Sequence, residues 1–365
     1  MKKSPIKSWS GLVLAVMLRV CLFGSQNASA QGPAAPAAIH TWRAINNGLP
    51  DNFPSSPLVV LASPVDSNTV YAGFNTAGVY RTVNAGLNWS PVNTGLPDGP
   101  SIDMLASSPD GSVLYARNAS YVGGGLFRAS PGNMHWTLLD KAPTYDTIFS
   151  LYVDATSVYI GTYSMGIYRS TTAGDSWTHI DGSPYPGGWN TIAGTPQNSK
   201  LLYAGISAVY KTIDGGDNWT TMPSLGCPGG GTYIMDVKID PAKATTVVVG
   251  DDGECIARST DGKTWTPVYT SQGAKQILFD PADSSQVYAI AISFLDHYGS
   301  VLKSINNGQT WAGFNDGLPF GTVISLSIGR GGREKPSAVY AALTTSGIYT
   351  TRPPMYFTYL PIAQR

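Results

Sequence analysis

The sequence predicts an all-β fold, a seven-bladed β-propeller whose last blade is closed by a strand from the N-terminal region. Short apolar segments rich in β-branched and aromatic residues recur between Gly, Pro, Asn and Asp, as strands do. Tryptophans in a repeated turn lie 41 to 47 residues apart, the length that a four-stranded blade needs. No segment has a convincing helical apolar period, so we expect almost no helix.

Each period has the same order of strands. In one period the first strand reads PLVVLASP at 57–64, the second TVYAGF at 69–74 and the third GVYRT at 78–82. The turn RTVNAGLNWS at 81–90 follows and opens the fourth strand, and it has near-copies in KTIDGGDNWT at 211–220 and KSINNGQTWA at 303–312. The tryptophans of the series are Trp42, Trp89, Trp136, Trp177, Trp219, Trp265 and Trp311.

The repeated turn has a structural explanation. An Asp or Asn side chain before the tryptophan can accept backbone N–H bonds within its own turn, and the tryptophan buries a large area against the blade. Thr172 and Pro131 replace the acid in two copies, so we expect those two turns to be less well braced. The structural residues that we assign to the turns are Asn84, Trp89, Trp177, Asp214, Trp219, Asp261, Trp265, Asn306 and Trp311.

The segments KTIDGGDNW, KSINNGQTW and RSTDGKTW closely resemble the Asp-box, or BNR repeat. That repeat occurs in sialidases, xyloglucanases, sortilin-type receptor domains and the photosystem II assembly factor. The resemblance covers nearly the whole chain after the first forty residues and implies a propeller. It also implies that the Asp-box turns lie on one face, while the loops after the second and fourth strands share the other. It says little about activity, because a fold does not fix function.

The ends of the chain predict how the ring closes. TWRAINNGLP at 41–50 matches NWSPVNTGLP at 88–97 and TWAGFNDGLP at 310–319, which end complete periods. The last period, at 321–351, has three strands and no tryptophan turn. We therefore expect the N-terminal segment to supply its fourth strand, which removes two open sheet edges. The predicted propeller spans residues 40–354, between a linker at 31–39 and a tail at 355–365.

Residues 1–30 have the layout of an export signal. Lys2, Lys3 and Lys7 precede an apolar stretch, and Ala28-Ser29-Ala30 follows it. We expect the mature chain to be a monomer that is secreted, periplasmic or on the cell surface. Loss of the four cations in this segment from a balanced 23 basic and 23 acidic residues leaves an acidic chain, which disfavours nucleic acid as a partner. Cys227 and Cys255 are then expected to form a disulfide, the alternative being two buried thiols.

Loops assigned to the face opposite the Asp-box turns are rich in aromatic residues with carboxylates nearby. Such a surface suits stacking on sugar rings or capture of a peptide, so we expect a glycan or an extracellular protein as partner. The alternative is that these aromatic residues only cover the ends of strands. The candidate ligand-binding residues are Tyr121, Tyr145, Tyr163, Tyr185, Trp189, His297 and Tyr298.

A glycoside hydrolase, sialidase-like or xyloglucanase-like, is the main alternative to a non-catalytic binding module. It requires two carboxyl groups at a set separation, for which the candidates are Asp146, Asp251, Asp252 and Asp296. The Arg-Ile-Pro signature of sialidases is missing, and four arginines, Arg81, Arg128, Arg169 and Arg258, recur in the third strand, where they are structural. A second alternative is an assembly factor for a membrane protein complex. The histidines are too scattered for a zinc site, and we expect no metal and no cofactor.

Overall fold

The computed structural model describes residues 41–50, 55–120, 125–143, 146–180, 182, 191–228, 233–253, 255–292, 299–331 and 337–353. The predicted export signal, the linker and the tail lie outside these residues. In the described part of the chain, no helix is long and apolar enough to cross a membrane.

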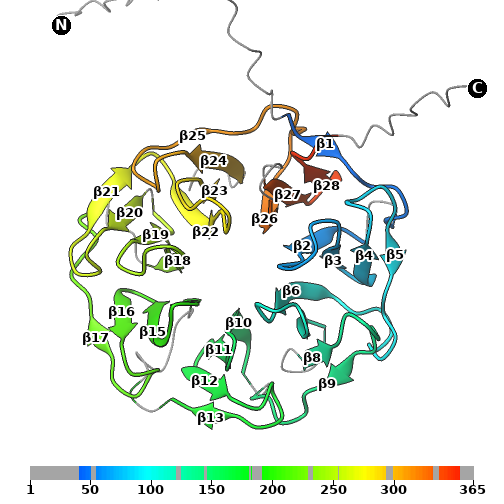
Figure 1. Ribbon diagram of the computed structural model, residues 1–365, viewed down its shortest axis with the longest axis horizontal. Coiled ribbons are helices and arrows are strands. Elements are labelled where there is room, and N and C mark those ends of the chain that lie inside the picture. Colours follow the sequence, from blue (N-terminus) through cyan, green and yellow to red (C-terminus); the bar gives the residue numbers. More distant parts are fainter. Residues whose placement is uncertain are drawn as a thin grey trace, which may run out of the picture. The chain divides into compact units, whose positions relative to one another are not determined.

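The described residues form seven four-stranded antiparallel sheets arranged around a central axis, which confirms the predicted propeller (Figure 1). Within each blade the chain runs outward, so the first strand is innermost. The first strands are β2 (Pro57–Ala62), β6 (Ile102–Ser107), β10 (Ile148–Val153), β14 (Thr191–Thr195), β18 (Ile234–Ile239), β22 (Gly273–Phe279) and β26 (Val323–Gly329). The second strands are β3 (Val70–Phe74), β7 (Leu114–Asn118), β11 (Val158–Thr162), β15 (Asn198–Gly205), β19 (Val247–Asp251), β23 (Val287–Ile292) and β27 (Ala338–Leu343).

The outer two strands of each blade are shorter. The third strands are β4 (Gly78–Thr82), β8 (Gly125–Ala129), β12 (Ile167–Ser170), β16 (Val209–Thr212), β20 (Ile256–Ser259), β24 (Ser300–Ser304) and β28 (Gly347–Thr350). The fourth strands are β5 (Ser90–Pro91), β9 (Thr137–Leu138), β13 (Thr178–His179), β17 (Thr220–Thr221), β21 (Thr266–Tyr269), β25 (Ala312–Gly313) and β1 (Arg43–Ala44). We number the blades 1 to 7 from β2 to β26 by their first strands.

The N-terminal strand closes the ring as predicted. In blade 7, β1 pairs with β28, with Arg43 opposite Thr350 and Ala44 opposite Tyr349 (Figure 1). The N–H of Ile45 extends this ladder with a 2.9 Å bond to the carbonyl of Ile348. Residues about 300 apart in the sequence therefore complete one sheet.

The core lies between neighbouring blades. The second strands are almost wholly buried, because both of their faces pack against adjacent sheets. One apolar cluster, for example, joins Val60 and Trp89 of blade 1 to Tyr340 and Ile348 of blade 7. Stability is thus shared along the ring, and each blade depends on its neighbours.

The Asp-box turns are braced as the sequence predicted. Asp214 accepts the N–H of Asn218 at 3.0 Å, and Asp261 accepts that of Thr264 at 2.8 Å. The expectation of a weak brace is wrong for Thr172, whose hydroxyl accepts the N–H of Ser176 at 2.9 Å. A threonine oxygen reaches the same donor as the carboxylate does.

In five of the six Asp-box repeats, the cation that begins the repeat joins one blade to the next. Arg128 of blade 2 donates to the carbonyl of Ala173 in the Asp-box turn of blade 3, at 2.9 Å. Arg258 of blade 5 does the same to Asn307 of blade 6, at 2.7 Å. Equivalent bonds from third-strand cations to the following turn are made by Arg81, Arg169 and Lys211. The four arginines of this set are those to which the sequence assigns a structural role.

The predicted disulfide is also present. Cys227, in the loop after β17, is bonded to Cys255, which lies just before β20, with a Cα–Cα distance of 5.9 Å. The bond ties the loop between blades 4 and 5 to the loop between the second and third strands of blade 5. Cys255 is fully buried within the core cluster of that region.

Candidate binding site at the central channel

A bulge recurs at one position in the innermost strands. In six of the seven first strands, the register with the second strand slips by one residue near the start of the strand. A bulge leaves its extra residue unpaired and re-aims the side chain. In blade 4 the irregularity lies elsewhere, between Gly194 and Thr195. We call the six bulged residues the channel collar: Leu58, Asp103, Phe149, Met235, Lys275 and Ile324.

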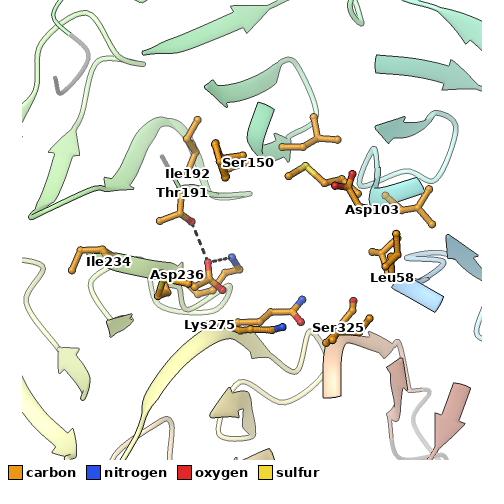
Figure 2. A pocket seen from close by; sticks show the side chains of 18 residues that line it. Leu58, Asp103, Ser150, Thr191, Ile192, Ile234, Asp236, Lys275 and Ser325 are labelled. Carbon is orange, nitrogen blue, oxygen red and sulfur yellow. Dashed lines mark hydrogen bonds and ion pairs between the residues drawn. The ribbon is translucent and has the colours of Figure 1, made fainter. Parts of the chain in front are cut away.

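All six collar residues line one cavity of about 410 Å³ that runs between the seven first strands (Figure 2). The collar lies near one end of the channel. In blade 3, for example, Ile148 pairs with Thr162, the last residue of β11, so Phe149 lies close to the loop that joins β11 to β12. The collar is therefore at the face of the second-to-third-strand loops, away from the Asp-box turns.

An aromatic pair extends the collar to the surface. The ring of Phe149 lies 5.7 Å from that of Tyr163, which is 51% exposed in the loop after β11. We call Phe149 and Tyr163 the aromatic ledge. Tyr163 is the one predicted ligand-binding residue that falls within the described ranges. The other six lie outside them: Tyr121, Tyr145, Tyr185, Trp189, His297 and Tyr298.

Asp146, a candidate catalytic acid, holds the loop that carries Tyr163. Its carboxylate accepts N–H bonds from Thr147 at 2.8 Å and from Met165 at 2.9 Å, and a third from Ser164. Partial burial acts to raise the pKa of Asp146, but these donors outweigh it and lower the pKa. Asp146 therefore stays ionised and braces the loop.

Asp251, at the end of β19, and Asp252, directly after it, both accept main-chain N–H bonds. Asp251 is buried and accepts the N–H of Gly253 at 3.1 Å and of Cys255 at 3.0 Å. Burial raises its pKa, and those N–H donors partly oppose the rise. Asp252 accepts the N–H of Tyr233 at 2.9 Å. The fourth candidate, Asp296, lies outside the described residues.

One of these acids, Asp251, lies beside the disulfide. The group of metal-ligand side chains found in the described ranges is Cys227, Asp251 and Cys255. Both sulfur atoms are already in the disulfide, so they cannot act as thiolate ligands.

The two carboxylates that line the channel are each paired with a cation. Asp103 of the collar lies 3.5 Å from the guanidinium of Arg117, which also donates to the carbonyl of Ile148. Burial raises the pKa of Asp103, while Arg117 acts to lower it. Asp236 accepts a 2.6 Å bond from Lys238 and a 2.8 Å bond from the N–H of Ile277. Arg117, which lies in a second strand and not in a third strand, thus pairs with a carboxylate of the channel.

Lys275 differs from these groups. It lies on the bulge of β22 among the residues around the channel (Figure 2), and it makes no hydrogen bond or ion pair with the described residues. Burial lowers the pKa of its ammonium group.

The sequence did not identify Lys275, Asp103 or Phe149 as candidate site residues. The available signal was a charged or aromatic residue near the start of an apolar first-strand segment.

Comparison with known proteins bears on the fold. No family model matches the chain, and no curated protein matches it. Among solved structures, the GH74 xyloglucanase from Xanthomonas campestris is 16% identical over 85% of this chain and 53% of its own, with a TM-score of 0.64. This chain thus spans about half the length of that enzyme. YCF48 from Cyanidioschyzon merolae is 14% identical over 85% of this chain and 98% of its own, with a TM-score of 0.59.

Two further similar structures have other descriptions. One is YCF48 bound to a D1 peptide, which is 15% identical over 84% of this chain and 97% of its own, with a TM-score of 0.58. The other is the extracellular domain of a putative hybrid two-component system from B. thetaiotaomicron, 13% identical over 87% of this chain and 40% of its own, with a TM-score of 0.63. At these identities the likeness shows the fold alone. The chain therefore shares the seven-bladed fold of GH74 xyloglucanases and YCF48, as its resemblance to Asp-box propellers predicted.

Proposed function

We propose that this chain is an exported, non-catalytic binding module that receives an apolar segment of a protein partner at the mouth of its central channel. The observation that carries the proposal is the collar: four of its six residues are apolar, and the aromatic ledge continues them to the surface. Concave apolar surfaces with a few polar groups are typical binding sites.

A protein partner fits this surface better than a glycan does. A sugar ring needs many hydrogen-bond partners, because its hydroxyl groups lose water on binding. Several polar side chains of the channel are already used: Asp236 by Lys238 and Ile277, and Gln276 by the main chain of Leu326. Apolar side chains of a peptide would instead gain about 25 cal/mol for each Å² that they bury here.

The comparisons are compatible with this proposal. A protein of the same fold, YCF48, has been solved with a D1 peptide bound. An assembly factor would be one kind of protein that uses such a site. A hydrolase of the xyloglucanase kind has less support, because the described candidate acids Asp146, Asp251 and Asp252 already accept main-chain N–H bonds.

A displayed random-peptide library selected on the immobilised chain tests the proposal. We expect enrichment of peptides with apolar anchors. Binding of the enriched peptides, measured by fluorescence anisotropy, should weaken at least about tenfold in Phe149→Ala and in Tyr163→Ala, since truncation of a central aromatic residue costs more than about 1.4 kcal/mol. Ile305→Ala is the matched control, because Ile305 is a 72% exposed apolar residue in an Asp-box turn at the other end of the blades.

A glycan array and a panel of fluorogenic glycosides should be run on the same preparation. Glycan binding without peptide enrichment would refute the choice of a protein partner. Turnover of any glycoside that is lost in Asp146→Ala would refute the non-catalytic role. Peptide binding that is equal in Phe149→Ala and the parent chain would show that the channel mouth is not the site.

A further inference from the structure

We propose that the central channel holds the carboxylate of its ligand, with Lys275 as the cationic partner and the apolar collar residues around the ligand's apolar group. This inference rests on the proposed function, because it concerns the same channel. It adds the chemical class of the ligand.

Among the charged groups that line the channel, one cation has no acidic partner in the described part of the chain. Of the two charged collar residues, Asp103 is paired with Arg117, whereas Lys275 has no partner among the described residues. Lys238, the other lysine of the channel, is bonded to Asp236 at 2.6 Å. An unpaired charge in a partly buried site is costly, and an anion beside it offsets that cost. The ammonium group of Lys275 therefore favours a ligand with a negative charge.

A single negative charge fits better than a phosphate. Groups that bind phosphate usually combine arginine forks or several main-chain N–H donors at a helix N-terminus. In the described lining of this channel, Lys275 is the one cation without an acidic partner, and Asp103 and Asp236 would repel a second negative charge. A monoanionic carboxylate matches a single ammonium group.

The apolar residues of the collar determine which kind of chemical group, attached to the carboxylate, fits the channel. Leu58, Phe149, Met235 and Ile324 line the same cavity. A volume of about 410 Å³ is within the range of pockets that enclose small ligands. The ligand class is therefore a carboxylate on an apolar group. It can be a free monocarboxylic acid or the last residue of a polypeptide with an apolar side chain.

Octanoate is the first probe, measured by isothermal titration calorimetry against the full chain. We expect octanoate to bind at least tenfold more tightly than 1-octanol or octylamine. Lys275→Met should lower octanoate affinity at least tenfold, and Lys275→Arg should retain it. Lys303→Met is the control, because Lys303 lies on β24 with its ammonium 5.2 Å from the centre of the Tyr288 ring, outside the channel lining.

A second arm separates the two sources of the carboxylate. A library-selected peptide is compared with the same peptide amidated at its C-terminus. Loss of binding on amidation and in Lys275→Met assigns the site to a chain end, whereas Lys275-dependent binding of octanoate alone assigns it to a free acid. If neither probe depends on Lys275, the inference is wrong. Peptide binding that needs Phe149 but not Lys275 would leave the proposed function standing and remove this inference alone.

Discussion

The indole N–H of Trp42 donates to the main-chain carbonyl of Phe314 at 2.8 Å, and the two rings meet edge to face with centroids 5.6 Å apart. The main-chain N–H of Trp42 also donates to Asp316 at 2.9 Å. These contacts join blade 6 to blade 7, where no Asp-box turn exists for a third-strand cation to hold. The same arrangement recurs at the next two joints, where Trp89 bonds to Ile45 and Trp136 to Val92.

Replacement of Trp42 by alanine should therefore open the ring. Trp42 is 3% exposed and belongs to the core cluster of blades 6 and 7. We expect Trp42→Ala to lower the free energy of unfolding by about 3–5 kcal/mol, as large-to-small core substitutions do. Urea denaturation measures this change, with Ile305→Ala as the exposed control. A loss below about 1 kcal/mol would contradict the closure by Trp42.

Deletion of residues 41–50 should lower the melting temperature further than Trp42→Ala does, and it should promote aggregation, because it exposes the edge of β28.

A second prediction concerns the close approach of Gly317 to Trp42. Gly317 has a φ of +88°, and a Cβ there would lie 2.5 Å from the carbonyl oxygen of Trp42. We expect Gly317→Ala to destabilise the chain by about 2–4 kcal/mol, from the positive φ together with overpacking. Gly99→Ala is the matched control: its φ is +61°, but a Cβ meets nothing within 4 Å, so the cost should be about 1 kcal/mol. Equal losses in thermal unfolding would mean that the contact with Trp42 carries no energy.

The architecture was predictable because every blade has the same pattern of strands and turns in the sequence. The tryptophan spacing fixed the number of blades, and the match of 41–50 to 88–97 fixed the closure. The site was less predictable. Asp146 looked like a catalytic acid, but its role follows from main-chain N–H groups that only the folded loop brings together.

The residues of the channel collar could not be predicted from the sequence either. Lys275 and Phe149 face the channel because a bulge shifts the register of their strands, and simple alternation of side chains does not reveal a bulge. Likewise, the missing partner of Lys275 becomes visible only when the other channel charges are seen to be paired. Spatial neighbours from separate blades cannot be read from a single repeat.

A third prediction concerns the disulfide. Cys227 and Cys255 are 28 residues apart in the sequence. Closing a loop of that length stabilises the folded state by roughly 3–4 kcal/mol in the chain-entropy model. We expect the Cys227→Ser, Cys255→Ser double variant to lose about this much in urea denaturation. Addition of a reductant should lower the melting temperature of the parent chain but not of the variant. If the double variant is as stable as the parent chain in urea, the bond contributes nothing to stability.

The last prediction concerns acid stability. Hydrogen bonds from Thr212 and Asn218 lower the pKa of Asp214, and main-chain bonds from Thr264 and Lys263 lower that of Asp261, both below the ordinary value of 3.8. Because the folded-state pKa is the lower one, the stabilisation is complete above pH 3.8 and is lost as the pH falls below it. The melting temperature should therefore fall below about pH 4, as it would from such carboxylates in general.

The double variant Asp214→Asn, Asp261→Asn isolates these two groups in the same titration. It should fold, because amides already fill the equivalent position in two native turns, where Asn84 accepts the N–H of Asn88 and Asn306 that of Thr310. Since an amide does not titrate, the fall in melting temperature between pH 4 and pH 2 should be shallower in the variant than in the parent chain. An identical fall would show that acid unfolding is governed by other carboxylates, such as Asp146 and Asp283, whose pKa values are also lowered.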